Sequence, residues 1–333
     1  MGLQKTTTAA AAALGMVILI LDGKTALVGA QEGIELCLRT VIPSLFPFFI
    51  LSSLLVGSLD ARWLRPVGKL CGIPAGAEAL LLTGFLGGYP TGAQCVSQAR
   101  SSGKLTKAQA ERMIAVCSNA GPSFLFGMVS QMFTESSMVW LLWAVHILSA
   151  VLVGMILPRE DTAPTSVTLP RIPLPQALSG AVGTIALVCG WVVFFRIGIT
   201  FLNRWILWLL PEVWQVALCG LLELSNGCCA LHRIASPAMR FLVCPGLLAC
   251  GGVCVTMQTA SVTRGLSLKY YIPGKLLQTL LSLALASVIQ LTFPEPAAFG
   301  GRILLLSLLG GLLLAGILRK KKINSGIPRL VGV

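Results

Sequence analysis

Apolar residues gather in long runs that recur from one end of the chain to the other. A helix needs about 20 residues to cross a hydrocarbon layer of about 30 Å. Windows that reach or approach this length are 8–21, which is short, 41–59, 138–157, 177–197, 202–221, 272–291 and 303–318. The pattern therefore predicts an all-α, polytopic membrane protein.

Four further apolar segments are interrupted by glycine, proline and polar residues. The interruptions are "GFLGGYPTG" at 84–92, "SNAGP" at 118–122, "GLLELSNG" at 220–227 and "GGVCVTMQTAS" at 251–261. Corresponding interruptions begin about 136 and 133 residues apart. Unwound backbone at membrane depth is tolerated only where it lines a cavity or is buried in protein. We therefore predict two structural repeats with broken and re-entrant helices, and a binding site at the breaks.

The domain organisation follows from one segment near the middle of the chain. Residues 158–175, "PREDTAPTSVTLPRIPLP", contain five prolines and cannot be helical throughout. The sequence predicts a first membrane half at 1–157, a Pro-rich linker at 158–175 and a second membrane half at 176–333 that ends in a basic tail, "RKKK", at 319–322. Within the first half, the polar stretch 97–113 predicts a hairpin that turns at Ser102 and Gly103 and continues in a helix capped by Thr106.

Composition narrows the function classes. Of the 333 residues, 55% are apolar and 11% are charged, with a mean hydropathy of +0.85, whereas a soluble domain carries about 25% charged residues. The net charge of +13 is spread over short connections and the tail, which is typical of anchors on anionic lipid. We therefore expect the lipid bilayer, and no nucleic acid, among the partners of this chain.

The eleven cysteines lie mostly within apolar runs and lack the spacing of a metal site. They predict buried free thiols, no metal and no cofactor. The HExxH and GxSxG motifs and paired aspartates at catalytic spacing do not occur in the sequence, so we expect no enzyme.

The breaks supply the candidate binding residues. Pro90 and Pro122 suit the first position of a new helix, and a helix N-terminus offers free amides and partial positive charge to a ligand. Two such N-termini facing one cavity favour an anionic solute, which polar side chains of the breaks would hold by hydrogen bonds. The candidates are Gly88, Tyr89, Pro90, Thr91, Ser118, Asn119, Ser123, Glu223, Ser225, Asn226, Thr256, Gln258 and Thr259.

Two features of the breaks have structural interpretations as well as functional ones. Glu223 is an ionisable residue at membrane depth, so it is a candidate to bind a cation, relay a proton or pair with an arginine. The alternative is that it caps a helix end near the membrane interface. The glycines of the breaks also serve close helix packing in many membrane proteins.

Residues 44–56, 84–113 and 117–129, together with "GLLELSNGCCAL" and "GGVCVTMQTAS" in the second half, carry a family resemblance. They resemble the nucleoside-recognition, or Gate, family, and within it the sporulation integral membrane proteins of the YlbJ (SpoVV) type. The resemblance implies re-entrant hairpins and a role in endospore formation, the movement of dipicolinic acid across the outer forespore membrane. On that basis the carboxylates of dipicolinate would lie at the amides near Thr91 and Ser123, with Asn119, Asn226 and Gln258 orienting the ring.

Two other functions stay open from the sequence. One is a carrier of nucleosides or other small solutes. The other is a membrane scaffold for a sporulation complex without transport, for which exposed hairpin residues such as Arg100 and Lys104 would matter more than the breaks.

Overall fold

The computed structural model describes residues 2–58, 60–159, 167, 169 and 171–292, and in these residues the regular structure is entirely helical. In the first half the helices are α1 (Gly2–Leu21), α2 (Gly23–Leu36), α3 (Ile42–Ser58), α4 (Arg65–Leu70), α5 (Glu78–Leu86), α6 (Thr91–Ser101), α7 (Lys107–Cys117) and α8 (Ser136–Ile156). In the second half they are α9 (Leu174–Trp205), α10 (Glu212–Leu222), α11 (Leu224–Cys229), α12 (Pro237–Cys250), α13 (Gly252–Val262) and α14 (Tyr271–Thr292). Short 3-10 and π-helical segments join several of them, including the π-helical η1 (Cys37–Val41) and η3 (Ser123–Met128).

Five helical stretches of the described residues are long and apolar enough to cross a bilayer. They are Gly23–Leu55, Ser137–Ile156, Leu174–Trp205, Pro237–Val262 and Tyr271–Thr292. Since about 20 apolar residues suffice for one crossing, the chain is an all-α, multi-pass membrane protein, as the pattern of apolar windows predicts.

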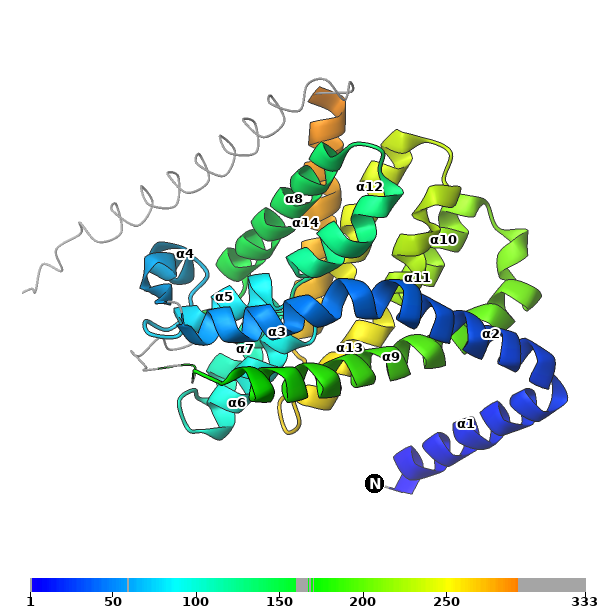
Figure 1. Cartoon of the computed structure of the whole chain (residues 1–333), viewed down its shortest axis with the longest axis horizontal. Helices are drawn as coiled ribbons and strands as arrows, with labels where there is room; N and C mark the ends of the chain where they lie inside the picture. Colours follow the sequence, from blue (N-terminus) through cyan, green and yellow to red (C-terminus); the bar gives the residue numbers. More distant parts are fainter. Residues whose placement is uncertain (1, 59, 160–166, 168, 170, 293–333) are drawn as a thin grey trace, which may run out of the picture.

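The long helix formed by α2, η1 and α3 runs antiparallel to α9, and the two lie side by side in Figure 1. Two glycines allow the close approach. A Cβ atom on Gly29 would lie 2.8 Å from Cα of Ile197, and one on Gly33 would lie 2.9 Å from Cα of Val193. Residue numbers rise along α2 as they fall along α9, which fixes the antiparallel direction. The predicted window 41–59 covers only the second part of this helix, because polar residues such as Glu32 lower the hydropathy of the first part.

All four predicted interruptions are breaks between helices. The chain leaves helical structure between α5 and α6, between α7 and η3, at Glu223 between α10 and α11, and at Gly251 between α12 and α13. Gly88 and Gly251 have φ angles of +73° and +70°, a backbone conformation that glycine adopts without steric cost. The order of a long helix, a broken pair, a second broken pair and a long helix occurs once in α3 to α8 and again in α9 to α14.

The hairpin between α6 and α7 has the predicted geometry. Gly103 turns the chain with φ +74°. The Thr106 hydroxyl accepts a hydrogen bond from the Gln109 amide at 3.2 Å, and the Thr106 amide donates to Oε1 of Gln109 at 2.9 Å. This reciprocal pair is a capping box, which fixes the start of α7.

One predicted span is wrong. Residues 202–221 do not form one helix, because α9 ends at Trp205 and α10 starts at Glu212 after a turn through Pro211. Proline cannot donate the amide hydrogen bond that a continuous helix needs. The window 303–318, the basic tail 319–322 and half of the linker 158–175 lie outside the described residues, and the division of the chain into two halves stays a prediction.

All eleven cysteines are free and buried or half-buried, as their positions in apolar runs predict. Most of the described core lies among α3, α8, α9, α12 and α14, and a second apolar cluster surrounds α5 to α7. Helix α1 extends away from the other helices (Figure 1).

Candidate functional site

A buried lysine on α14 lies where two helix breaks meet. Lys275 is 4% exposed. Its Nζ donates to Oη of Tyr89 at 3.0 Å, to Oε1 of Gln278 at 2.8 Å and to the backbone oxygen of Ser118. Tyr89 belongs to the break before α6 and Ser118 to the break after α7. The lysine therefore joins α14 to both broken helices of the first half.

The contacts of Lys275 match the donors of an ammonium group. An ammonium group has three N–H donors, and all three have an oxygen acceptor here. Tyr89 uses its own hydroxyl hydrogen to donate to the Leu248 backbone oxygen at 3.3 Å, so a lone pair of Tyr89 faces Nζ. The three acceptors therefore suit the protonated form of Lys275.

Neutral oxygens alone hold this charge. Among the described residues, the ion pairs include neither Lys275 nor a carboxylate beside it. A buried charge without a counter-charge is costly, and such residues in membrane helices mark ligand or ion pathways. A protonated Lys275 would therefore place an uncompensated positive charge inside the bundle at this point.

A second layer of polar groups surrounds the lysine. Gln278 Nε2 donates to Oδ1 of Asn119 at 3.2 Å, and Asn119 Nδ2 donates to the Val116 backbone oxygen at 2.8 Å. His146 Nε2 accepts a hydrogen bond from the Ala120 amide at 3.0 Å. The bonds to Val116 and Ala120 hold the end of α7 and the break that follows it. We call Tyr89, Ser118, Asn119, His146, Lys275 and Gln278 the Lys275 cluster.

Two atoms of the Lys275 cluster have no hydrogen-bond partner in the described structure. They are the Ser118 hydroxyl oxygen and His146 Nδ1, and both residues are fully buried. A buried polar atom without a partner costs about 1–3 kcal/mol. The cluster therefore has unused hydrogen-bonding capacity beside its positive charge.

Contacts between α7 and the loop before α14 hold the start of α14 in place. Glu111 accepts a hydrogen bond from the Ser267 amide at 3.0 Å and lies 3.2 Å from Nζ of Lys269. Glu111 lies outside the five apolar spans. Burial acts to raise the pKa of its carboxyl, but the Ser267 amide and the lysines outweigh this effect and hold the pKa below its usual range. The carboxylate is thus a stable anchor for the segment that leads to Lys275.

Glu223 belongs to a different cluster. Its carboxylate accepts hydrogen bonds from the Ser225 and Asn226 amides at 3.0 and 2.7 Å, and from the Asn226 side chain at 2.6 Å. Asn226 Oδ1 in turn accepts from Arg196 on α9 at 2.9 Å, and Arg196 pairs with Glu32 on α2 at 2.9 Å. Glu223 therefore caps α11 and is linked to an arginine through Asn226. Of the interpretations from sequence, this geometry favours the helix cap.

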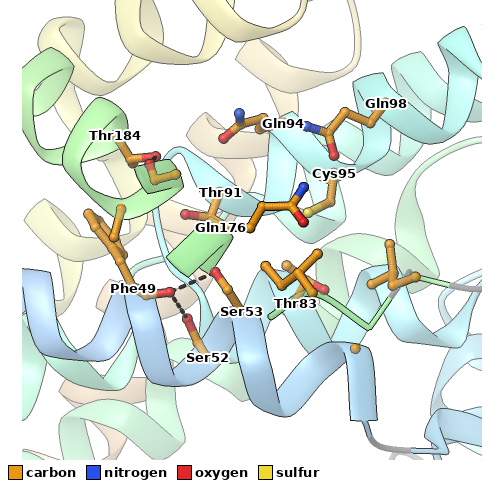
Figure 2. A pocket seen from close by; sticks show the side chains of 15 residues that line it. Phe49, Ser52, Ser53, Thr83, Thr91, Gln94, Cys95, Gln98, Gln176 and Thr184 are labelled. Atoms are coloured by element: carbon orange, nitrogen blue, oxygen red, sulfur yellow. Dashed lines mark hydrogen bonds between the residues drawn. The ribbon is translucent and has the colours of Figure 1, made fainter. Parts of the chain in front are cut away.

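A pocket of about 300 Å³ lies beside the break that contains Tyr89. Figure 2 shows the side chains of Gln94, Gln98, Gln176 and Thr91 gathered around it. The lining residues are Phe49, Ser52, Ser53, Gly57, Thr83, Thr91, Gln94, Cys95, Gln98, Leu169, Ile172, Gln176, Gly180, Ala181 and Thr184. We call it the amide pocket. Its lining consists of hydroxyl, amide and apolar groups and includes no charged side chain.

We call Glu32, Arg196, Glu223, Ser225 and Asn226 the Glu223 cluster. A second pocket, of about 280 Å³, lies beside this cluster. Its lining residues are Glu32, Leu36, Arg196, Asn203, Cys219, Asn226, Cys229, Ala230, His232 and Arg233. It lies between α2, α9, α10 and α11, whereas the amide pocket lies between α3, α5, α6 and α9. We call it the arginine pocket.

The structure distributes the predicted site residues over several places. Tyr89, Ser118 and Asn119 meet at Lys275, and Thr259 lies next to them through Tyr271, whose Oη accepts its hydroxyl at 3.4 Å. Thr91 lines the amide pocket. Three other predicted site residues, Glu223, Ser225 and Asn226, belong to the Glu223 cluster.

The other predicted residues have local roles. Gly88 packs against Gly121, Pro90 directly precedes α6, and Ser123 is buried at the start of η3. Thr256 and Gln258 bond within their own helix, to Gly252 O at 3.0 Å and Cys254 Sγ at 3.3 Å. Ser123 is therefore not among the residues that line the amide pocket with Thr91.

The sequence interpretation missed Lys275 and Gln278. Both stand in the window 272–291, which is otherwise strongly apolar. The rule that singles out Glu223, an ionisable residue at membrane depth, applies equally to Lys275. The sequence interpretation also missed Gln94, Gln98 and Gln176 of the amide pocket, because their helices meet only in the folded chain.

Apolar spanning helices, four helix breaks and polar clusters inside the bundle define an α-helical integral membrane protein with buried polar sites. Over 204 residues the chain is 26% identical to the sporulation integral membrane protein YlbJ of Bacillus subtilis (strain 168), a match that covers 50% of this chain and 49% of YlbJ. The similarity supports a YlbJ-like family, as the motifs predict. The chain spans about half the length of the curated relative it matches. Comparison with family models gave no match, and comparison with solved structures gave none.

Proposed function

We propose that this protein is a membrane carrier for a small anionic solute, most specifically dipicolinate, which it moves across the outer forespore membrane during sporulation. The observation that carries the proposal is the meeting of two helix breaks and α14 around an interior ammonium group. Broken helices at membrane depth are typical of substrate sites in carriers. Interior positive charge favours an anion over a neutral or cationic solute.

The name of the relative supports the biological setting. YlbJ is a sporulation integral membrane protein, and the resemblance of the break motifs extends that setting to this chain. The proposed activity is transport without a chemical step. In this scheme Glu223 fixes the second pair of broken helices by capping α11.

Uptake into proteoliposomes tests the proposal. Labelled dipicolinate and labelled uridine are offered side by side to the wild-type protein and to Asn119→Ala, which removes the amide that joins Gln278 to the end of α7. We expect dipicolinate uptake by the wild type and a fall of about tenfold in the variant, the size expected when a hydrogen-bonded group of a site is removed. Glu223→Gln is made in parallel as a variant of the other cluster.

A second function has its own supporting observation. The amide pocket is uncharged and rich in hydroxyl and amide groups, which suits a neutral solute such as a nucleoside. Uptake of uridine without uptake of dipicolinate would favour a nucleoside carrier. Uptake of neither solute, together with a sporulation defect in Arg100 or Lys104 variants, would favour the scaffold.

A further inference from the structure

We infer that Lys275 is the group that binds a carboxylate of the solute, and that Tyr89 Oη and the Ser118 backbone oxygen occupy the position of that carboxylate until it arrives. If the chain is the carrier proposed above, on which this inference rests, then Lys275 selects the substrate by charge. The chemical class of ligand is a mono- or dicarboxylate.

The first step is the mismatch between the charge and its partners. Nζ of Lys275 has three oxygen acceptors, so no donor is idle, but each acceptor is neutral. At short range in an interior of low dielectric, a carboxylate attracts an ammonium far more strongly than a hydroxyl or an amide oxygen does. A carboxylate that reaches Nζ would therefore displace a neutral acceptor.

The second step is the unused hydrogen-bonding capacity beside the charge. Ser118 has its backbone oxygen on Nζ and its hydroxyl without a partner, and His146 Nδ1 is also without one. Both residues have 0% exposure. A hydroxyl and an imidazole N–H can each donate to a carboxylate oxygen, and the second nitrogen of His146 already accepts from Ala120, which leaves Nδ1 as the protonated nitrogen. Lys275 on α14, Ser118 in the break after α7 and His146 on α8 thus offer one ammonium group and two further donors at one place.

The third step is that Tyr89, which contacts the lysine, belongs to the same break as Thr91, which lines the amide pocket. The Tyr89 hydroxyl also donates to Leu248 on α12, so it ties the first break to a broken helix of the second half. A carboxylate at Nζ would take the place of the Tyr89 hydroxyl as an acceptor of the lysine, while Tyr89 could keep its bond to Leu248.

Substitutions of Lys275 and of Tyr89 are expected to change the KM for dipicolinate in opposite directions. Lys275→Gln removes the charge, so the KM for dipicolinate should rise about 10- to 100-fold, the range for a lost hydrogen bond to a charged group. Uptake of the uncharged analogue pyridine-2,6-dicarboxamide should change less than about threefold. Tyr89→Phe keeps the ring but removes the competing hydroxyl, so the KM for dipicolinate should fall. Lys275→Arg keeps the charge and should retain a preference for the dicarboxylate over the diamide.

The control and the contrary outcomes are equally specific. Arg39→Gln removes one positive charge from a side chain that is 79% exposed and should leave both substrates unaffected. A lysine with only a structural role would make Lys275→Gln lower the uptake of both substrates equally and would make Tyr89→Phe deleterious too; either result overturns the inference. If Lys275→Gln does not fold, the direction of the Tyr89→Phe effect and the selectivity of Lys275→Arg decide.

Failure of the carrier function is distinguishable from failure of this inference. If the wild type transports neither substrate, the shift in Tm that dipicolinate causes in detergent measures binding directly. A shift in the wild type and in Arg39→Gln that is absent from Lys275→Gln would support the carboxylate site and contradict transport. An equal shift in all three proteins, or none in the wild type, would overturn the site.

Discussion

At the scale of single residues, Arg112 and Lys275 show two different reasons to bury a cation. Arg112 is 1% exposed and donates to the backbone oxygens of Gly72, Gly154 and Pro158 at 3.2, 2.7 and 2.7 Å. Two of these carbonyls lie at the C-terminal end of α8, where the last carbonyls of a helix lack partners and carry partial negative charge. Arg112 therefore ties α7 to the end of α8 and to the turn at Gly72, whereas two of the three acceptors of Lys275 belong to helix breaks.

Replacement of Arg112 by methionine should destabilise the protein. The change keeps an apolar stem of similar length but leaves three carbonyls without their donor, for a loss of about 3 kcal/mol or more. The measurement is thermal unfolding in detergent, followed by size-exclusion chromatography. Arg39→Met, at an exposed position, is the matched control, and an equal Tm for both variants would show that the bonds of Arg112 do not stabilise the fold.

At the scale of elements, pairs of glycines fix the broken helices in both halves. A Cβ atom on Gly92 of α6 would overlap the backbone oxygen of Cys117 and lie 2.9 Å from Cα of Gly84 on α5. In the second half, one on Gly227 of α11 would overlap the backbone of Gly220 on α10. Both pairs allow the two arms of a broken helix to touch. The glycines of the breaks thus serve close packing, while polar residues of the same segments form the interior clusters.

Gly92→Ala and Gly183→Ala should have opposite effects on stability. The first forces a methyl group into backbone atoms, an overpacking that costs about 2 kcal/mol. The second places a methyl group on α9 where no atom lies within 4 Å, so better helix propensity should stabilise by about 0.5 kcal/mol.

Unfolding in detergent measures both glycine variants against the wild type. Destabilisation by Gly183→Ala equal to that of Gly92→Ala would show that neither result reports on the contact between α5, α6 and α7.

At the scale of the whole molecule, the antiparallel pairing of α2 and α3 with α9 separates the two pockets. The amide pocket lies against α3 and the start of α9, and the arginine pocket against α2 and the end of α9. On α9, about 18 Å of helix separates Thr184 of the first pocket from Arg196 of the second, at 1.5 Å per residue. Since the long helix crosses the membrane, the pockets should face opposite sides.

A labelling experiment in sealed vesicles tests this arrangement. Gln98→Cys in the amide pocket and Arg233→Cys in the arginine pocket should react with a membrane-impermeant maleimide from opposite sides. The background replaces the half-buried cysteines Cys95, Cys189, Cys229 and Cys250 by serine, and this background without an added cysteine is the control. Labelling of both positions from the same side would contradict the opposed orientation of the pockets.

The sequence by itself determined the class of protein and the places where its helices break. Apolar windows and glycine-proline interruptions are local properties, and a bilayer about 30 Å thick converts them directly into spans and breaks. It also marked the turn at Gly103 and the cap at Thr106. The window 202–221 was wrong because mean hydropathy does not register the stop at Pro211.

Only the tertiary structure decided which breaks share a site. Lys275 is separated by 186 residues from Tyr89 and by 157 from Ser118, and no local pattern brings such residues together. The same holds for Glu223, whose sequence is compatible with a cation site, a proton relay, an arginine pair or a cap until the amides of Ser225 and Asn226 are placed around it. Local periodicity fixes where helices begin and end, but the packing of distant helices decides which polar groups face one another.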